Sequence, residues 1–521
     1  MVIAAFMISG YGILKGLIAV LVLSIILGFY DIVMKPTLFR RRFSKYPNVY
    51  VRPTFTFLVG DFDKAIEDET SNRIYYQHIK EEAALRNKYD LKVDIEGKVL
   101  TLSLISDRAM REYVALSPNK IDKFRWLKGP MKIEIGSISV EGTSTEILNR
   151  RKYLSSLLGL NAGSKYIPQM LSCCEEYVQK LKTKGKVQFM DEMLTFAFYT
   201  LACILFGSDI KLLMGKKHSF KNEDGTIEEL TLLEYFCKIE QAFMKEFTNP
   251  ITGLLPIISD LNLIDPFKTN QRNFQIYRKA LNEMLAQSKD NESIWAQLKN
   301  KDDYDQDKIR CDLQMYVFAG AESISHNIVS ALYFLKKFPD SYAKLKKELN
   351  DHGIHKGADF NKVLTIDKLD ELEYLSCVVK EALRFDPPFP QGYFYTAKED
   401  ITLCDVPIPK GTIMKHDYLS GSFNEKSYLR PMEFIPDRFN PESEFYQESV
   451  KSGVSPEPYS KRFFGMGTRR CPGQSFGVLQ CKLIIAYLVS SMDYEVDSDL
   501  LSNDYAGFGL GGNFTPYFTI T

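Results

Sequence analysis

The segment FFGMGTRRCPG, residues 463–473, constrains this chain more than any other. It places one cysteine, Cys471, after two arginines and ahead of a proline and the long apolar run FGVLQCKLIIAYLVSS. Glycines at Gly465, Gly467 and Gly473 permit left-handed backbone and close approach of a bulky ligand. The apolar run predicts a buried helix, and a proline is typical of a first helical position. A helix N-terminus and neighbouring arginines both favour the thiolate, so we expect Cys471 to have a chemical role.

The composition excludes several classes of protein. The chain has 521 residues, of which 45% are apolar and 25% charged, as in ordinary globular proteins. Its 66 basic and 66 acidic residues balance, so nothing indicates nucleic-acid binding. Nine scattered cysteines without a CxxC pair argue against a disulfide framework and favour a reducing, cytosol-facing environment. Length alone predicts more than one domain.

The first residues read as a membrane anchor. Residues 2–30 carry one charge, Lys15, and are long enough to span a hydrocarbon core of ~30 Å. A cleaved signal peptide and a buried helix of a soluble protein are the alternatives, but no small-x-small cleavage site follows. Basic residues gather between 35 and 45, which places the rest of the chain on the cytoplasmic side. We therefore expect an anchor over residues 1–34.

Hydrophobic periodicity predicts a mainly α-helical fold with a smaller β region. Residues 89–105 read as two strands around a tight turn, and 385–440 contain short β-like runs between prolines. Two helices are expected to end at Gly185 and Gly207. The longest helix is predicted from Asp305 to Lys337, where Pro339 halts it.

That long helix contains the stretch FAGAESIS. A glycine inside a helix costs about 1 kcal/mol relative to alanine, so Gly320 needs a reason. One reason is a close helix crossing, and another is room for a flat ligand beside Ala319. In the second case Glu322 and Ser323 would relay protons to that ligand.

Two further motifs are weak when taken alone. In VVKEALRFDPP, Glu381 and Arg384 stand three residues apart, on one face of a helix. Such a pair by itself indicates a surface salt bridge, worth little to stability. Arg438 of FIPDRFNP by itself reads as a solvated arginine.

Other chemistries find no support in the sequence. Glu322 and His326 are four apart but form no HExxH motif, so zinc is not indicated. The glycines between 507 and 512 are not followed by a helix-forming segment, which rejects a dinucleotide fingerprint. GQSFG at 473–477 matches a hydrolase motif only literally, because the last histidine, His416, precedes it.

Together, and in this order, these motifs resemble those of the cytochrome P450 family of haem-thiolate monooxygenases. The resemblance implies one large haem domain over residues 35–521, mainly α with a smaller β region. It implies haem b (iron protoporphyrin IX) as cofactor, with Cys471 as the axial ligand of the iron. In the family's loop pattern, Phe464 would shield the sulfur, Gly467 and Gly473 would shape the loop, and Arg469 would pair with a haem propionate.

The resemblance also assigns roles to the weaker motifs. Ala319 and Gly320 would make space over the distal face, and Glu322 and Ser323 would help deliver protons. A structural network on the proximal side would consist of Glu381, Arg384 and Arg438.

The chain departs from the family pattern at three positions. Ser323 stands where threonine is usual, which keeps the hydroxyl but loses its methyl-fixed orientation. Ile147 occupies the place of a tryptophan that contacts a propionate, four residues before Arg151. Tyr395 occupies the place of an arginine that reaches the haem. Propionate binding is therefore expected to rest on Arg469 and Arg151.

The resemblance implies a monooxygenase that inserts one oxygen atom of O2 into an apolar small molecule: a lipid, sterol, terpenoid or foreign compound. Electrons are expected from NADPH through a separate NADPH–cytochrome P450 reductase, with cytochrome b5 as a further partner. The enzyme is expected to be a single-pass protein of the endoplasmic reticulum. A basic surface around Arg470, with Lys461, Arg462 and Lys482, is the expected docking face.

Two other functions remain open from the sequence. One is a haem-thiolate enzyme that needs no reductase, either a peroxygenase or an isomerase of oxygenated lipids. The other is a non-catalytic haem-binding or sensor protein at a membrane.

Overall fold

The structure is a computed structural model of the chain. It describes residues 22–23, 26–54, 56, 60–61, 63, 88–96, 99–116, 120–124, 136–207, 215–248, 261–262, 264–301, 304–389, 392–425, 427–454, 463–497 and 516–521. The predicted anchor over 1–34 lies largely outside this part of the chain. Among the described residues, only α9 (Phe189–Phe206) is long and apolar enough to cross a bilayer, and 78% of it is buried. Its apolar surface therefore serves the protein core.

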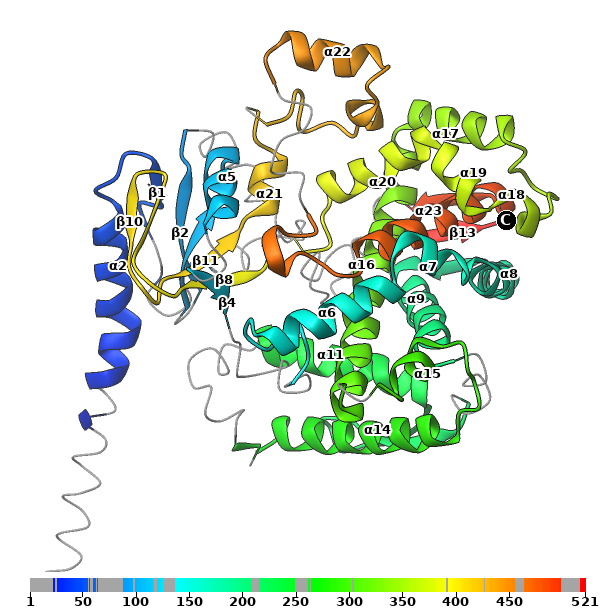
Figure 1. Ribbon diagram of the computed structural model, residues 1–521, viewed down its shortest axis with the longest axis horizontal. Helices are drawn as coiled ribbons and strands as arrows, with labels where there is room; N and C mark the ends of the chain where they lie inside the picture. Colours follow the sequence, from blue (N-terminus) through cyan, green and yellow to red (C-terminus); the bar gives the residue numbers. More distant parts are fainter. Residues whose placement is uncertain are drawn as a thin grey trace, which may run out of the picture.

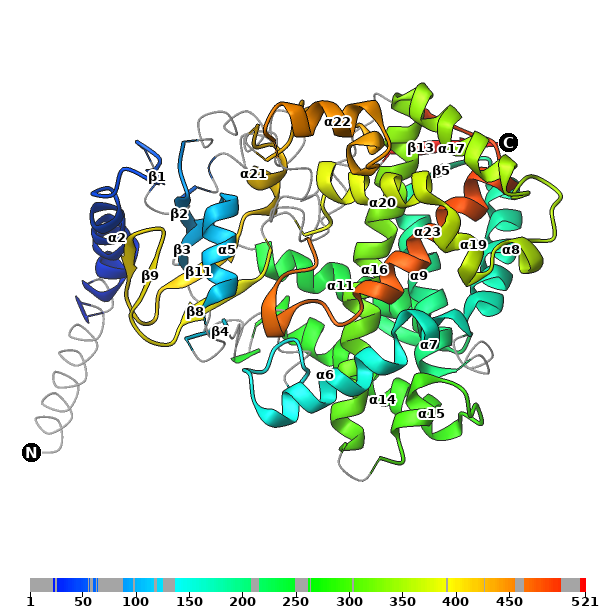
Figure 2. The same ribbon diagram turned by 45° about the horizontal axis from the view of Figure 1, so that its top comes forward.

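The fold is mainly helical, as predicted, with a smaller β region beside the helices (Figures 1 and 2). The remaining helices are η1 (Tyr30–Met34), α2 (Lys35–Phe43), α5 (Asp107–Ala115), α6 (Thr145–Leu157), α7 (Leu160–Ser164), α8 (Ile167–Lys184), α11 (Leu232–Thr248), α14 (Phe267–Gln287), α15 (Ile294–Leu298), α16 (Gln306–Lys337), α17 (Pro339–Asp351), α18 (Phe360–Val363), α19 (Ile366–Glu371), α20 (Glu373–Phe385), α21 (Tyr418–Ser422), η3 (Pro436–Phe439), α22 (Glu444–Lys451), η5 (Gly467–Arg469) and α23 (Gln474–Ser491).

The central helix α16 organises the helical part. Its start is capped by Asp305, whose carboxylate accepts a hydrogen bond from the Lys308 amide at 3.1 Å. Two lysines occupy its last turn, where they complement the helix dipole, and Pro339 opens α17 directly after it. It packs against α9, α20 and α23, and Figure 1 shows it passing behind α6 toward α20. The predicted helix over 305–337 is confirmed.

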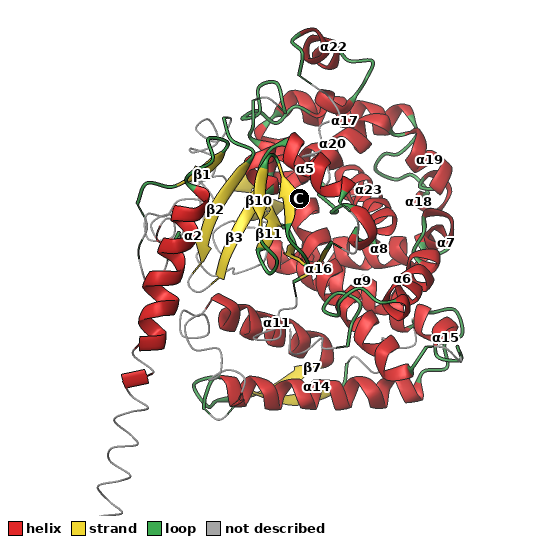
Figure 3. Ribbon diagram, turned by 60° about the vertical axis from the view of Figure 1, so that its left-hand side comes forward, coloured by secondary structure: helices red, strands yellow, loops and turns green. Residues whose placement is uncertain are grey.

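The largest sheet lies on one side of the helices (Figure 3). Its six strands run in the order β1-β2-β3-β11-β8-β4. The strand bounds are β1 (Val49–Val51), β2 (Leu91–Glu96), β3 (Val99–Leu104), β4 (Ile121–Lys123), β8 (Phe394–Ala397) and β11 (Ile413–His416). The two strands predicted within 89–105 are thus confirmed as β2 and β3, which pair antiparallel.

Smaller sheets complete the β region. Their strands are β5 (Lys186–Gln188), β6 (Lys217–Lys221), β7 (Ile227–Thr231), β9 (Ile401–Leu403), β10 (Val406–Ile408), β12 (Tyr494–Asp497) and β13 (Tyr517–Ile520). The last of these, β13, lies near the end of the chain and pairs with both β5 and β12. The glycines before it lie outside the described residues. The helices predicted to end at Gly185 and Gly207 are confirmed as α8 and α9.

One ionic cluster is buried inside the large sheet. Asp94 of β2 lies 2.5 Å from the Lys92 ammonium and 3.5 Å from that of Lys415, and it accepts a hydrogen bond from Ser103. Burial raises the pKa of the Asp94 carboxyl, but the two lysines and the Ser103 hydroxyl outweigh it and bring the pKa below its ordinary value. The folded protein therefore favours the ionised carboxylate.

Candidate active site

A cavity of about 260 Å³ separates the middle of α16 from the cysteine loop. It brings together the α16 residues Ala319, Gly320, Glu322 and Ser323 and the loop residues Phe464, Cys471 and Gly473. Most of the remaining wall is apolar, with contributions from Leu201, Phe318, Ile324, Leu383, Phe389 and Phe394. Two segments about 150 residues apart in sequence thus face one apolar space.

The cysteine loop is shaped by its glycines. Gly465 and Gly467 have φ values of +76° and +68°, in the left-handed region that favours glycine. The Cys471 amide donates a 2.7 Å hydrogen bond to the Phe464 carbonyl, which closes the loop. Helix α23 begins at Gln474, so the prediction that Pro472 takes the first helical position is wrong by two residues. The closed loop thus ends before the helix begins along the chain.

The electrostatics of Cys471 differ from the expectation. Burial raises the pKa of its thiol, and the opposing effects of the Gly473 amide and the cations Arg151 and Arg470 do not reverse the shift. The favourable charges are present as predicted, but desolvation exceeds them. A metal ion bonded to sulfur would change this balance, because a coordinating thiol is deprotonated outright.

Arg469 is held by backbone groups. Its guanidinium donates to the carbonyls of Ile138 and Glu141 at 2.9 and 2.8 Å, and to the Thr143 hydroxyl at 3.2 Å. Burial and the nearby charge of Arg151 lower its pKa. A guanidinium has five N–H donors, so two on Arg469 have no partner among the described residues.

Arg151 lies on α6, close to the cysteine loop. It is 9% exposed, donates to the Arg470 carbonyl, and lines a second pocket of about 350 Å³ that also reaches Cys471. Ile147, one turn earlier, is 3% exposed and packs in the helical core. The structure therefore places Arg151 near the cysteine loop, while Ile147 offers no polar group there.

The α16 motif borders both the cavity and helix α9. A Cβ atom added to Gly320 would lie 2.8 Å from Cδ1 of Leu201, so the leucine side chain would have to move. The close crossing of α16 and α9 is therefore one reason for a glycine at this position. Gly320 also lines the cavity, which is the second reason that the sequence allowed. Ser323 is exposed to the cavity, and its hydroxyl donates to the Ala319 carbonyl at 2.7 Å. Glu322 is 8% exposed.

The acid and two arginines of the weaker motifs meet in a buried cluster. Arg384 is bonded to both oxygens of Glu381 at 2.8 and 2.9 Å, and both residues are fully buried. The Arg438 Nε atom lies 3.4 Å from the same carboxylate, and burial lowers the pKa of this arginine to about 10. The surface salt bridge and the solvated arginine that each motif alone suggests are both wrong.

Tyr395, which stands where an arginine was expected, belongs to a buried aromatic cluster missed by the sequence reasoning. Its ring lies 5.2 Å from those of Tyr113 and His416, and His416 in turn lies 5.8 Å from Tyr418. Burial lowers the pKa of His416 to about 3, so this histidine is neutral. Lys123 pairs with Tyr395 across β4 and β8, and its side chain lines the cavity. A cation therefore stands beside the position that lacks the arginine.

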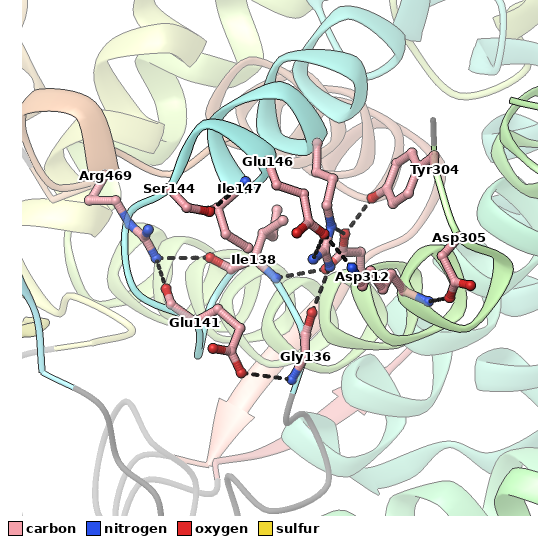
Figure 4. A network of polar contacts seen from close by, with 12 residues as sticks. Gly136, Ile138, Glu141, Ser144, Glu146, Ile147, Tyr304, Asp305, Asp312 and Arg469 are labelled. Carbon is pink, nitrogen blue, oxygen red and sulfur yellow. Dashed lines mark hydrogen bonds and ion pairs between the residues drawn. The ribbon is translucent and has the colours of Figure 1, made fainter. Parts of the chain in front are cut away.

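A second buried network, also missed, supports the loop that holds Arg469 (Figure 4). Asp312 of α16 accepts hydrogen bonds from Arg150, Tyr304 and the Ile138 amide. Asp312 and Arg150 are 162 residues apart in sequence, and neither belongs to a recognisable motif. No local pattern could have revealed this contact.

The donor set fits an iron porphyrin. Within the described residues, no group of three or more His, Cys, Asp and Glu could hold a metal ion; of the two cysteines that line the cavity, Cys471 lies in the glycine-rich loop and Cys481 lies on α23. A metal bound there by one thiolate must bring its other ligands with it, as an iron porphyrin does. Lys123 lines the cavity and Arg151 the second pocket, and both charges act on Cys471; Arg469 lines neither of these two pockets but lies near enough to Arg151 for their charges to interact. The buried Tyr316 hydroxyl, also in the wall, has no partner in the described part of the chain.

Comparison with known proteins gives consistent results. The family model described as "Cytochrome P450" matches residues 126–510. Cytochrome P450 26A1 of Gallus gallus is 32% identical over 34% of this chain and 35% of its own length. Cytochrome P450 monooxygenase lnbC of Aspergillus flavus is 28% identical over 37% of this chain and 36% of its own. Cytochrome P450 3A2 of Rattus norvegicus is 26% identical over 70% of this chain and 72% of its own.

A solved structure supports the fold. The retinoic-acid-bound cyanobacterial CYP120A1 superposes with a TM-score of 0.66 over 85% of this chain and 93% of that one, at 18% sequence identity. The first two relatives above are matched over little more than a third of their length, whereas the likeness of the fold extends over most of the chain.

Proposed function

Since this chain belongs to the cytochrome P450 family, we propose that it is a haem-thiolate monooxygenase acting on an apolar small molecule. It inserts one oxygen atom of O2 into that molecule and reduces the other to water. One observation carries the proposal: Cys471, in the loop that follows two arginines, lines the same apolar cavity as Glu322 and Ser323 of α16.

Members of this family bind haem through a cysteine thiolate, and the proposed ligand is Cys471. When bound, the haem supplies the activation of dioxygen, which thiolate donation favours. The chain's own part is to hold the sulfur. The left-handed glycines and the amide bond to Phe464 fix the loop, and Gly473 keeps a Cβ out of the space before the sulfur.

The cations around the site are proposed to bind the carboxylates of the cofactor. Arg469 has two N–H donors to offer, and Arg151 and Lys123 lie near enough to Cys471 to affect the pKa of its thiol. Charge-assisted hydrogen bonds from a guanidinium to a carboxylate are among the stronger polar contacts in proteins. Lys123 would compensate in part for the arginine that Tyr395 replaces.

Glu322 and Ser323 are proposed to move protons into the cavity. A hydroxyl has one donor and two acceptor positions, so Ser323 can accept from a water while it donates to the Ala319 carbonyl. Glu322 follows on the same wall and supplies the exchangeable proton. The apolar remainder of the cavity excludes bulk water from the reacting centre.

The apolar wall favours an apolar substrate, whether lipid, sterol, terpenoid or foreign compound. We propose that electrons come from NADPH through a separate cytochrome P450 reductase, with cytochrome b5 as a second donor, at an endoplasmic reticulum membrane reached by the predicted anchor. Of the expected docking residues, Arg470 is exposed, and Lys461 and Arg462 lie outside the described residues. Lys482 is only 7% exposed, so it contributes little to a docking face.

The experiment that tests this function supplies 18O2 to the haem-loaded protein with a P450 reductase, NADPH and a panel of apolar substrates. We expect product that carries one labelled oxygen and depends on both NADPH and reductase. Unlabelled product formed with peroxide alone would indicate a peroxygenase. Rearranged product formed without any reductant would indicate an isomerase, and no product with any substrate would favour a non-catalytic haem protein.

A further inference from the structure

Arg469 donates its hydrogen bonds to one segment, residues 136–143, called here the 136–143 loop. Among the described residues outside the cysteine loop, no other segment accepts a hydrogen bond from this guanidinium. The carbonyls of Ile138 and Glu141 and the Thr143 hydroxyl bind three N–H groups of its guanidinium. The orientation of Arg469, and of its two remaining donors, is therefore set by this loop. What fixes the loop also fixes the arginine.

One end of the 136–143 loop is held from the central helix. The Ile138 amide donates to Oδ1 of Asp312 at 2.7 Å, and the Gly136 carbonyl accepts from Arg150 at 2.7 Å. Arg150 is bonded to both oxygens of Asp312, at 2.7 and 3.0 Å, and the Tyr304 hydroxyl donates to the same carboxylate. Asp312 is fully buried, so its contacts are shielded from water.

The other end is held from the sheet. Asp122 of β4 accepts from the Thr143 amide at 3.1 Å and from the Thr143 hydroxyl at 2.7 Å. Two carboxylates from different layers thus bind opposite ends of one short loop, and Arg469 binds between them. Figure 4 shows the Asp312 end of the loop and the contacts of Arg469 with Ile138 and Glu141. The Asp122 charge also attracts the Arg469 guanidinium.

We propose that Asp312 and Asp122 are positioning residues for Arg469, which act through the 136–143 loop to aim its two remaining N–H donors at a carboxylate of the cofactor. This inference rests on the proposed role of Arg469. Asp312 stands two helical turns before Ala319 on α16, so the same rigid helix that forms the cavity wall also sets the direction of the arginine.

The test measures haem transfer from the loaded protein to excess apomyoglobin. Asp312→Asn and Asp122→Asn keep the shape of each side chain and remove its charge. Each is expected to speed transfer about tenfold, since a hydrogen bond to a charged group is lost at each end. Tyr304→Phe, which leaves the ion pair intact, should give a smaller increase in the same direction and serves if Asp312→Asn does not fold.

A matched control is Asp386→Asn. Asp386 is also buried and is also bonded to α16, through His326 at 3.1 Å and Ser330, but it does not contact the loop. Its variant should transfer haem at the wild-type rate. An equal increase in Asp386→Asn and Asp312→Asn would show general loosening of α16 and overturn the inference.

The decisive comparison repeats Asp312→Asn in an Arg469→Leu background. If Asp312 acts through Arg469, it should cause no further increase there. Hydrogen exchange of the Ile138 amide should become faster in Asp312→Asn, with or without Arg469. Additive effects of Asp312→Asn and Arg469→Leu on haem transfer would overturn this inference but leave the proposed role of Arg469 intact. An Arg469→Leu protein that keeps its haem as tightly as wild type would instead contradict the proposed role of Arg469.

Discussion

The buried cluster of Glu381, Arg384 and Arg438 gives the clearest stability prediction. The Glu381 carboxylate accepts two hydrogen bonds from Arg384, at 2.8 and 2.9 Å, and one from the Ile435 amide at 2.7 Å, with Arg438 at 3.4 Å. All three charged side chains are at most 2% exposed. Glu381→Gln keeps the volume but leaves two buried guanidinium groups without a counter-charge.

Removing one partner of a buried ion pair typically costs about 3–5 kcal/mol. The backbone carbonyls of Ser422, Pro431 and Glu433 still accept from Arg384 in the variant, so we expect the lower half of that range, ~3–4 kcal/mol. Domains are stable by only about 5–15 kcal/mol, so the loss is large. Equilibrium urea unfolding followed by circular dichroism measures it.

A matched control is Glu371→Gln. Glu371 forms an ion pair with Lys368 at the same i,i+3 spacing, at 2.6 Å, but both side chains are exposed. This variant should unfold at the wild-type urea concentration because water screens the pair. A free energy of unfolding for Glu381→Gln within about 1 kcal/mol of the wild-type value would refute this reasoning, because the buried cluster would then contribute no more than a surface ion pair.

Three further predictions follow from single contacts. Ser323→Ala should divert reducing equivalents from product to peroxide in a coupling assay, and unchanged coupling would exclude its hydroxyl from proton delivery. In Gly320→Ala the added methyl group must displace Cδ1 of Leu201, which offsets the roughly 1 kcal/mol that alanine gains over glycine in a helix, so we expect no net gain in unfolding free energy; a double-mutant cycle with Leu201→Val should show coupling, and full stabilisation by Gly320→Ala alone would contradict this. Folding lowers the pKa of the Asp94 carboxyl, so its ionised form stabilises the folded state at pH values above about 4, the pKa of the carboxyl in the unfolded chain. That stabilisation is lost as the pH falls from about 4 toward the lower pKa of the folded state. Asp94→Asn should therefore flatten the fall of unfolding free energy below pH about 4, whereas parallel curves for variant and wild type would contradict this.

Local signals in the sequence were sufficient for most of the fold. The periodicity over 305–337, with a capping aspartate and a halting proline, predicted α16 because those signals act on neighbouring residues. The strands β2 and β3 and the glycine ends of α8 and α9 were predicted for the same reason. The start of α23 lies two residues later than predicted, after the loop that the Cys471 amide closes onto the Phe464 carbonyl.

The site was predictable in its parts but not in its electrostatics. Spacing placed Glu381 and Arg384 on one helix face, but their burial depends on carbonyls of a loop that lies 38 to 49 residues away. The charges beside Cys471 were visible in the sequence, whereas the desolvation that raises its pKa depends on the packed cavity. The contact between Asp312 and Arg150 joins residues 162 positions apart and left no sequence pattern.

The measurement that tests the central claim most directly is the absorption spectrum of the dithionite-reduced protein with carbon monoxide, recorded beside Cys471→His. Ligation by Cys471 predicts a strongly red-shifted Soret band in the wild type, as thiolate ligation gives, and its loss in a variant that still folds and binds haem. A wild-type band like that of a histidine-ligated haem, or a red-shifted band that survives in Cys471→His, would contradict ligation by Cys471.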